Sequence, residues 1–423
     1  MNILVVGSGG REHALISSLV KSRFGPMLYA APGNGGISEC AVCLDVRETD
    51  AGGIVRAAAE NSIDVAAVSS EAALAAGVAD ELEARGIRAF GPKKNAAVAG
   101  ISRTLSRQIF KKYGVPSVDY HSFDNYAEAE AFIGALEKFP AAIKSDGLSH
   151  LTSVIASDRT EAVDALRSMA AGNLHLSAGS HVTVEEDNDG REFSVPVFTD
   201  GRSVAPMPPI LPYKRVSGGN SGKNTEGMGA VCPAPFCTAR DVEYCTEKII
   251  VPTVAALNTE GRTFKGILQF VMTYTDDGIK AVELAPCLGD TEAETVLPLL
   301  ETDLVDVMNA VIDGTLARTD VRFSHKTAVS VVAASGGYPD GFATGCEIRG
   351  IEGFPQDNGL TLFHMGTEYR GDTVVTAGGR VLSVTAAADT AESAIYKAYQ
   401  NISRITFENM YYRHDIGKYR IWT

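Results

Sequence analysis

Apolar positions in the first hundred residues fall into short runs, each followed by a glycine-rich or polar turn and then by a helical spacing. Asn2 to Val6 and Met27 to Ala31 are apolar runs that end in glycine-rich turns. A third run, Val65 to Val68, precedes a predicted helix from Ala72 to Arg85. Repeated strand–turn–helix units predict a doubly wound α/β domain over residues 1–100, with its polar turns at the ligand-binding edge of a parallel sheet.

The following segment, 101–320, has a mixed α+β pattern. Helical spacings occupy Arg103 to Tyr113, Tyr126 to Leu136 and Thr160 to Met169, and an apolar strand ends in Lys144. The part of this segment from about 119 to 190 has the size and composition of a small mobile lid.

Two strands are predicted at the end of that lid. One runs from His181 to Glu186 and the other begins at Glu192-Phe193-Ser194-Val195. Asp189-Gly190 between them is a common hairpin turn sequence, so we predict that the two strands form a hairpin.

The stretch from Ala281 to Leu304 combines an apolar run with several acids. The run ends in Glu283, a Gly289-Asp290 pair follows, and a helical pattern opens near Thr295 and reaches Leu304. A carboxylate at a strand end, beside a tight turn and a helix start, is typical of a metal-assisted site. An edge strand with an exposed acid is the alternative interpretation of the same pattern.

Two regions complete the pattern. Residues 212–229 form a long polar, glycine-rich loop, which in a compact protein is more often functional than idle. The segment 321–423 alternates strands with turns and ends in a predicted helix from Ala391 to Asn409. The pattern as a whole predicts an α/β and α+β multidomain protein.

Composition narrows the class of protein. The 423 residues are 45% hydrophobic and 21% charged, as in ordinary globular proteins, and the net charge is −14. An acidic chain argues against nucleic acid or an anionic membrane as the main partner, and no apolar run reaches the ~20 residues of a membrane span. The seven cysteines have no disulfide or metal-site spacing. We therefore expect a cytoplasmic protein with reduced thiols.

Specific motifs occur in order along nearly the whole chain. They read GSGGREHA at 7–14, APGNGG at 31–36, FGPKK at 90–94, KSDGL at 144–148, EE with DGREFS at 185–194, KR at 214–215, NTEGMGA at 224–230, and then FHMGT, GGRVLSV and YYRHDIG in the last segment. Together they resemble the glycinamide ribonucleotide synthetase family. That resemblance implies an ATP-grasp core with a small lid, preceded by the doubly wound domain and followed by an α+β domain.

The resemblance also implies an activity and its requirements. Enzymes of that family join glycine to 5-phosphoribosylamine in purine biosynthesis, with ATP cleavage and a glycyl phosphate intermediate. The implied cofactors are ATP and Mg²⁺, and the implied partners are the small-molecule substrates rather than nucleic acid or a membrane. Such chemistry needs Mg²⁺ on the phosphates, backbone N–H groups around them, and exclusion of water.

Site residues are carried over by motif position. The implied catalytic residues are Arg215 and Asp290, and the implied metal ligand is Glu283, with Asp290 and Glu292 near it. The nucleotide-binding residues are Arg103, Lys144, Glu185, Glu186 and Glu192. The substrate-binding residues are Gly9, Gly10, Arg11, Glu12, Asn34, Glu71, Lys214, Asn224 and Thr225.

The chain departs from the family pattern at positions that serve ATP chemistry. Where the family has a glycine-lysine-glycine phosphate loop, this chain reads Ser149 to Val154, with Leu151-Thr152-Ser153 in place of residues that easily take φ > 0. Ala285 replaces the metal-binding Asn, Cys287 replaces an Arg, and Glu226 replaces a Gly beside the substrate loop. These changes put both ATP and Mg²⁺ in doubt as cofactors.

Three functional hypotheses therefore stay open at the level of sequence. The chain is a working phosphoribosylamine–glycine ligase, or a non-catalytic or weakly catalytic paralogue that binds a nucleotide or phosphoribosyl ligand, or an ATP-grasp ligase for another carboxylate and amine. Binding of ATP with Mg²⁺, and ADP release with glycine and phosphoribosylamine, discriminates among them.

Overall fold

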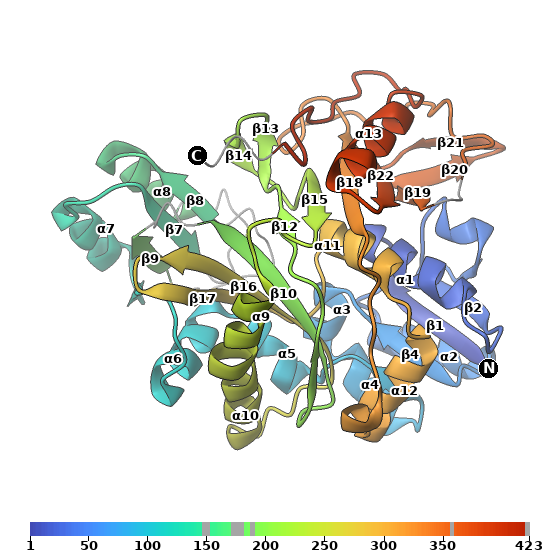
Figure 1. Ribbon diagram of the computed structural model, residues 1–423, viewed down its shortest axis with the longest axis horizontal. Helices are drawn as coiled ribbons and strands as arrows, with labels where there is room; N and C mark the ends of the chain where they lie inside the picture. The colour runs from blue at the N-terminus through green and yellow to red at the C-terminus, as the bar shows by residue number, and fades with distance from the viewer. Residues whose placement is uncertain (146–152, 171–181, 187–190, 356–358, 419–423) are drawn as a thin grey trace.

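The computed structural model describes residues 1–145, 153–170, 182–186, 191–355 and 359–418. Four sheets of four or five strands and two separate β-hairpins account for the strands in these ranges. Figure 1 shows the first domain in blue, the lid projecting on the opposite side, and the last segment in orange and red above the first domain.

The first domain is a five-stranded parallel sheet of order β3-β2-β1-β4-β5. Both faces are covered, because Ile3 and Val5 enter one hydrophobic cluster whereas Leu4 and Val6 enter another. The strands are β1 (Asn2–Gly7), β2 (Met27–Pro32), β3 (Val42–Cys43), β4 (Val65–Val68) and β5 (Arg88–Phe90); the helices are α1 (Gly10–Val20), η1 (Ile37–Glu39), α2 (Ala51–Glu60), α3 (Glu71–Ala76), α4 (Val78–Ala84) and α5 (Lys94–Ile101).

The strand order of this sheet reverses between β1 and β4, which are neighbours. The crevice at the carboxyl ends of such strands is the usual ligand edge of a doubly wound sheet. In this sheet the carboxyl ends of β1 and β4 lead into Gly7 to Gly10 and Ser69 to Glu71.

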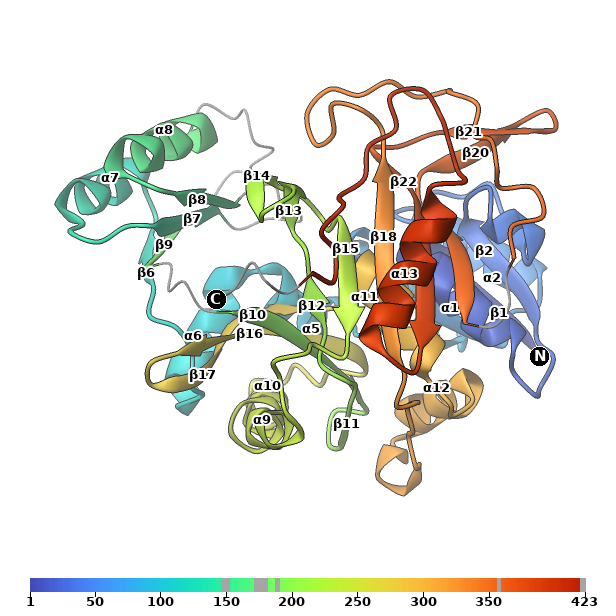
Figure 2. The same cartoon turned by 45° about the horizontal axis from the view of Figure 1, so that its top comes forward.

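The lid has its own four-stranded sheet, of order β6-β9-β7-β8, covered by two helices. Ile133, Ile143 and Leu166 lie in a small hydrophobic cluster that is separate from the others. Its elements are β6 (His121–Phe123), α7 (Tyr126–Ala135), β7 (Ala141–Ser145), β8 (Ser153–Ala156), α8 (Arg159–Ala170) and β9 (Val182–Glu186). Figure 2 shows this unit set apart from the remaining layers.

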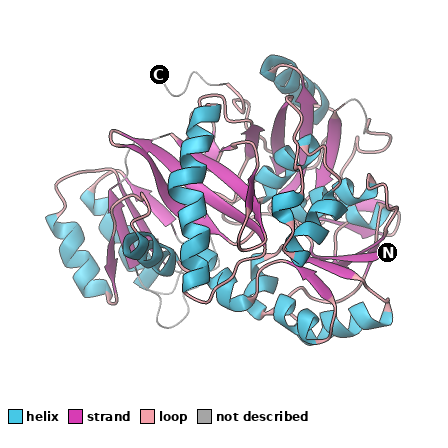
Figure 3. Ribbon diagram, turned by 60° about the horizontal axis from the view of Figure 1, so that its bottom comes forward, coloured by secondary structure: helices cyan, strands magenta, loops and turns pink. Residues whose placement is uncertain are grey.

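The central sheet is antiparallel, with the order β11-β10-β16-β17. Phe193, Phe270 and Leu284 point into the main hydrophobic cluster, which also takes in residues of the helices below. The opposite face presents alternate residues to a cavity. The elements are α6 (Arg103–Tyr113), β10 (Glu192–Thr199), β11 (Val204–Pro206), α9 (Ala239–Cys245), the π-turn η3 (Thr246–Ile250), α10 (Val251–Thr259), β16 (Gly266–Thr275) and β17 (Gly278–Ala285). Figure 3 shows the helical column along this sheet.

The fourth sheet, of order β12-β15-β18-β22-β19, combines strands from the middle and the end of the chain. Helix α13 packs on β18 and β22, whereas α11 packs between β15 and β18 of the sheet and α1 of the first domain. The elements are β12 (Leu211–Pro212), β13 (Arg215–Ser217), β14 (Ser221–Asn224), β15 (Gly229–Cys232), α11 (Asp290–Val296), η4 (Leu297–Leu299), α12 (Leu304–Asp313), η5 (Leu316–Arg318), β18 (Thr327–Ala334), β19 (Leu360–His364), β20 (Thr367–Arg370), β21 (Thr373–Thr376), β22 (Arg380–Ala388) and α13 (Ala391–Ile402).

Several predicted elements differ from the structure. The predicted helix 72–85 is two helices, because Gly77 takes a left-handed conformation with φ of 83° between them. The predicted helix near Thr295 begins earlier, at Asp290, and is interrupted before Asp303 caps α12. Helix α13 ends at Ile402 rather than at Asn409.

Strand pairing corrects two further predictions. β9 pairs with β6 and β7, whereas β10 pairs with β11 and β16, so the predicted hairpin across Asp189-Gly190 is wrong. The reason is that β10 buries its apolar face in the central sheet, so the chain leaves the lid between the two strands. Within the polar loop 212–229, β13 and β14 form a short hairpin and β15 enters a sheet.

Candidate active site

One cavity of about 630 Å³ lies where the first domain, the lid, the central sheet and the fourth sheet meet. Most of the sequence-predicted site residues line it. These are Arg11, Glu71, Arg103, Lys144, Glu185, Glu192, Lys214, Arg215, Asn224, Thr225, Glu283 and Asp290. Residues that are up to 279 positions apart in the chain therefore line one partly open cavity.

The lid end of the cavity holds a buried ion-pair triad. Glu185 on β9 accepts from Lys144 Nζ at 2.7 Å and from Arg107 Nη2 at 2.6 Å. Burial opposes ionisation of Glu185, but the two cations outweigh it and hold the pKa of the carboxyl below its ordinary value. The carboxylate is therefore charged at neutral pH and holds Lys144 in place.

Arg103 connects the lid to the central sheet. Its Nη1 donates to the backbone oxygen of Ser145 at 2.8 Å, and its Nε pairs with Glu283 Oε2 at 3.2 Å. β17 is an edge strand, as the alternative interpretation supposed. The Glu283 side chain is nevertheless only 14% exposed and faces the cavity, so the exposed acid of that interpretation is not found.

Lys214 lies among three acids. Its Nζ pairs with Glu192 Oε2 at 3.0 Å. Burial disfavours the charged ammonium, but Glu192, Glu283 and Glu292 together raise the pKa of Lys214 above its ordinary value. Lys214 therefore stays charged and joins the loop 212–229 electrostatically to the acids of the central sheet and α11.

The side chain at position 285 offers no oxygen to the cavity. Ala285 and Glu283 alternate along β17, and both line the cavity. Opposite Ala285 on β16 stands Gln269, which donates to Glu292 Oε1 at 3.2 Å and accepts from the Gly289 N–H at 3.1 Å. In the described part of the chain, no three His, Cys, Asp or Glu side chains gather as a metal-binding group.

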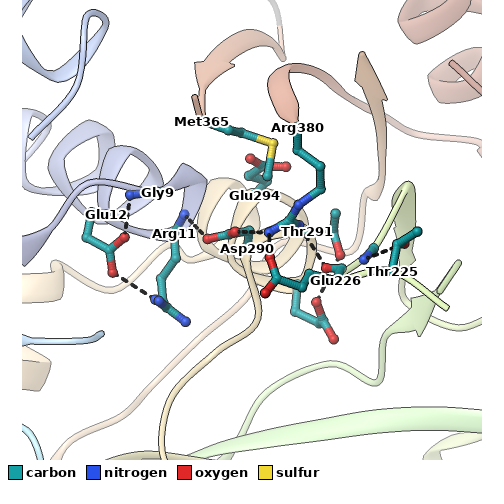
Figure 4. A network of polar contacts seen from close by, with 12 residues as sticks. Gly9, Arg11, Glu12, Thr225, Glu226, Asp290, Thr291, Glu294, Met365 and Arg380 are labelled. Atoms are coloured by element: carbon teal, nitrogen blue, oxygen red, sulfur yellow. Dashed lines mark hydrogen bonds and ion pairs between the residues drawn. The ribbon is translucent and has the colours of Figure 1, made fainter. Parts of the chain in front are cut away.

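Asp290 joins the first domain to the fourth sheet (Figure 4). Its Oδ1 accepts from the Arg11 backbone N–H at 3.0 Å, and its Oδ2 pairs with Arg380 Nη2 at 2.5 Å. Burial would raise the pKa of Asp290, but Arg380 and Arg11 outweigh it and lower that pKa. Arg380 also pairs with Glu226 Oε2 at 2.9 Å.

Four predicted residues lie behind the cavity wall rather than on it, namely Gly9, Gly10, Glu12 and Asn34. Glu12 accepts from the Gly9 N–H, from Arg11 Nε and from Ser69 Oγ, each at 2.8 Å. Asn34 donates to the backbone oxygens of Ser8 and His364. The geometry makes Glu12 and Asn34 supports of the first-domain loops.

The loop 212–229 is held by its own side chains, one of which reaches the backbone of the lid. Arg215 Nη1 donates to the Gly222 oxygen at 2.9 Å across the β13–β14 hairpin. Thr225 Oγ1 donates to the Lys214 oxygen at 2.7 Å. Asn224 Nδ2 donates to the Ser153 oxygen at 3.3 Å and so connects the loop with the lid.

Two predicted features lie at the edges of the described ranges. Glu186 ends β9 on the lid sheet, and only its backbone is described. The replaced phosphate loop lies outside the described residues except for Ser153 and Val154, which begin β8. Ser153 lines the cavity.

Sequence reasoning missed three polar side chains that the structure brings to this region: Arg107, Gln269 and Arg380. Arg380 stands in the GGRVLSV motif, which indicates the family resemblance but carries no sign of a role in a site. Arg107 and Gln269 had no local signal, because each gains its role from partners far away in the chain. Within the described ranges, no helix has the length and apolar character needed to cross a bilayer.

Comparisons with known proteins agree over the whole chain. The models of the N domain, the ATP-grasp (A) domain and the C domain of phosphoribosylglycinamide synthetase match residues 1–99, 101–293 and 328–419. The phosphoribosylamine–glycine ligase of Caldanaerobacter subterraneus subsp. tengcongensis is 37% identical over 99% of both chains. That of Mesorhizobium japonicum is 38% identical over 99% of this chain and 98% of its own.

Solved structures give the same picture of the fold. The phosphoribosylamine–glycine ligase of Thermotoga maritima has a TM-score of 0.83 and 26% identity, and the match covers 98% of this chain and all of that one. The biotin carboxylase domain of the Hydrogenobacter thermophilus 2-oxoglutarate carboxylase, solved with MgADP and bicarbonate, has a TM-score of 0.74 at 16% identity, over 97% and 91% of the two chains.

Proposed function

Because this chain belongs to the phosphoribosylglycinamide synthetase family, we propose that it joins glycine to 5-phosphoribosylamine with cleavage of ATP to ADP and phosphate. The observation that carries the proposal is the shared cavity: residues from the segments matched by all three family models line one space of about 630 Å³. A ligase of this kind needs such a space, because its nucleotide, acid and amine must meet away from water.

The reaction has two steps. A carboxylate oxygen of glycine attacks the γ-phosphorus of ATP, and ADP leaves. The amine of phosphoribosylamine then attacks the carbonyl of glycyl phosphate, the bond from the carbonyl carbon to the phosphate oxygen breaks, and phosphate leaves as the nitrogen loses a proton and the amide forms. Both steps move negative charge between oxygens, so fixed cations in a partly closed cavity stabilise them.

The lid end of the cavity is proposed to bind the nucleotide. Lys144 and Arg103 would face the phosphates, Glu185 and Glu186 the adenine, and Glu192 the ribose hydroxyls. The triad of Glu185 with Lys144 and Arg107 supports this assignment, because it fixes a cation at the cavity wall before the ligand arrives.

The opposite end is proposed to bind glycine and phosphoribosylamine. Lys214, Arg215, Asn224 and Thr225 would contact them from the substrate loop. Arg11 and Glu71 would form the first-domain wall, supported from behind by Gly9, Gly10, Glu12 and Asn34. Arg215 and Asp290 would be the catalytic residues.

The residues present fit Mg²⁺ bound largely by the nucleotide. Mg²⁺ in phosphoryl-transfer sites is commonly held by one or two carboxylates together with phosphate oxygens and water. Glu283 and Glu292 both line the cavity and could supply those carboxylates. Bound Mg²⁺ would neutralise charge on the phosphates.

A non-catalytic or weakly catalytic paralogue that binds a nucleotide or phosphoribosyl ligand is the second candidate, and the methyl group of Ala285 beside Glu283 favours it. Losing even an indirect metal partner typically lowers affinity or activity ~10–100-fold. Replacement of the phosphate loop at Leu151-Thr152-Ser153 would act in the same direction.

We also propose the chain division of 1–100, 101–320 with a lid at about 119–190, and 321–423, and a cytoplasmic location. The function is tested on the full chain by calorimetric titration with ATP and Mg²⁺, followed by ADP release on adding glycine and phosphoribosylamine. Binding with turnover that requires both substrates supports the ligase. Binding without turnover supports the second candidate, and turnover with another acid or amine would indicate a different ligase.

A further inference from the structure

Arg380 presents a buried guanidinium at the end of the cavity away from the lid. It begins β22, its side chain is 8% exposed, and it lines the cavity. Its Nη1 donates to the backbone oxygen of Glu226 at 2.7 Å, and its Nη2 faces the carboxylates of Asp290 and Glu226. A buried guanidinium at a cavity wall is a strong recognition group for carboxylate or phosphate.

The two carboxylates on Arg380 differ in how firmly they are held. Asp290 also accepts from the Arg11 backbone N–H and is 14% exposed. The Glu226 side chain is 47% exposed, and its carboxylate pairs with the guanidinium at 2.9 Å, compared with 2.5 Å for Asp290. Exposed ion pairs contribute little to stability, so the Glu226 pair is the weaker one.

The backbone at Glu226 does not depend on that ion pair. The Glu226 N–H donates to the Tyr338 hydroxyl at 3.4 Å, and the Glu226 oxygen accepts from Arg380. The Glu226 side chain can therefore rotate away from Arg380 while the loop keeps its place.

The charge of the cavity adds a second argument. Among the described lining residues, seven carboxylates face six Lys or Arg side chains. Phosphoribosylamine and ATP carry net negative charge and glycine carries a carboxylate, so each carboxylate of the lining opposes the binding of these anionic groups. Removing the charge of Glu226 alone would balance the lining.

We propose that Glu226 is a specificity-determining residue whose carboxylate occupies the anion-recognition position of Arg380 and must be displaced by an anionic group of a small substrate. The group is a carboxylate or a phosphate, since a guanidinium binds both. The identity of the substrate rests on the proposed function; the competition at Arg380 does not. Glu226 thereby lowers the affinity of the cavity for small anions and selects ligands with enough further contacts to overcome it.

The test compares wild type with Glu226→Gln, which keeps the backbone contacts and side-chain length but removes the charge. Two probes distinguish the sources of the anion: glycine for a carboxylate and ribose 5-phosphate for a phosphate. Each is titrated calorimetrically into the full-length protein at low ionic strength. We expect the dissociation constant of at least one probe to fall by about two- to ten-fold in the variant.

The matched control is Glu347→Gln. Glu347 is an exposed partner of Arg349 at 3.1 Å and does not line the cavity, so it loses the same charge without touching Arg380. Its affinities should equal those of wild type. Thermal unfolding of all three proteins checks that none has lost its fold.

Tighter binding of glycine alone assigns Arg380 to the carboxylate, and tighter binding of ribose 5-phosphate alone assigns it to the phosphate. Unchanged affinities, or weaker binding by Glu226→Gln, would overturn the proposal, the latter because Glu226 would then contact the ligand directly. Failure of both probes to bind either protein would also overturn it. The titrations need no turnover, so a protein without ligase activity can still show the competition.

Discussion

Arg413 Nη1 donates to the backbone oxygen of Arg215 at 2.8 Å, although 198 positions separate the two residues. The same guanidinium makes a two-point contact with Asp415, at 2.9 and 2.7 Å, and Asp415 accepts from the Gly219 N–H at 3.0 Å. The YYRHDIG motif near the end of the chain therefore holds the loop 212–229 in position. Arg413 is a positioning residue in this arrangement, because it does not line the cavity.

Replacing Arg413 with Lys should disturb both the fold and the substrate end of the site. The Arg413 side chain is fully buried, and Lys cannot reproduce the two-point contact. We expect a loss of about 3 kcal/mol in the free energy of unfolding, measured by urea denaturation. Under conditions where the variant is folded, KM for glycine should rise several-fold more than KM for ATP.

Arg349→Lys is the control for that change, because Arg349 forms an exposed pair with Glu347. It should alter neither quantity. Equal increases in both KM values for Arg413→Lys would mean that Arg413 serves stability alone.

Replacing Lys144 with Met should weaken nucleotide binding. The change keeps the length of the buried side chain but removes the cation at the lid end, while Arg107 still pairs with Glu185. We expect at least a ~10-fold increase in the dissociation constant for ATP, since charge-assisted contacts to phosphate are strong. Lys280→Met, at an exposed pair with Asp277, provides the comparison.

Glu294 predicts an unusual pH dependence of stability. Its carboxyl is fully buried below Gly10, and Oε2 accepts from Ser330 Oγ at 3.1 Å, whereas Oε1 has no hydrogen-bond partner among the described residues. Burial, assisted by Asp290, raises the pKa of Glu294 to about 8. The folded protein therefore holds a proton that the unfolded chain releases above pH ~4.3.

Because the folded state binds this proton more tightly than the unfolded chain does, the free energy of unfolding falls as pH rises. Stability from the Glu294 proton is complete below the unfolded pKa and is lost as pH rises toward about 8. Relative to Glu294→Gln, wild type should lose about 1.4 kcal/mol of unfolding free energy for each pH unit between 5 and 8. Urea denaturation at several pH values measures this, and parallel curves for the two proteins would show that Glu294 is ionised in the folded state.

Introducing a side-chain oxygen at position 285 tests the proposed Mg²⁺ site near Glu283. Ala285→Asn places a carboxamide beside Glu283 on the cavity face of β17. We expect about a 10-fold gain in Mg²⁺ affinity in the presence of ADP, followed by calorimetry. Ala285→Leu adds similar bulk without an oxygen and should give no gain. We do not expect Ala285→Asn alone to restore full ligase activity, because the phosphate loop is replaced as well.

Local patterns predicted most of the elements, and distant pairings account for the errors. β4 and α6 have the predicted bounds because their apolar spacing and flanking turns lie within a few residues. The predicted hairpin between β9 and β10 is wrong because strand partners depend on burial across the whole molecule, which a turn sequence does not encode. The break at Gly77 was visible as a glycine, but not as a left-handed one.

The site followed the same rule. Residues inside recognisable motifs, such as Lys144 and Glu283, were found and line the cavity. Arg380 and Gln269 were missed, because Arg380 acquires its role from Asp290, 90 positions away, and Gln269 from Glu292 on another element.

The mixed composition of the fourth sheet has a consequence for synthesis of the protein on the ribosome. β15 ends at Cys232, but its neighbour β18 begins only at Thr327. At a synthesis rate of ~5–20 residues per second, roughly 5–20 s pass between the synthesis of β15 and that of β18. The strands of the first domain, in contrast, are complete at Phe90. The first domain can fold while translation continues, whereas the cavity lining is complete only after Arg380 has emerged, and the contact that Arg413 makes with Arg215 forms later still.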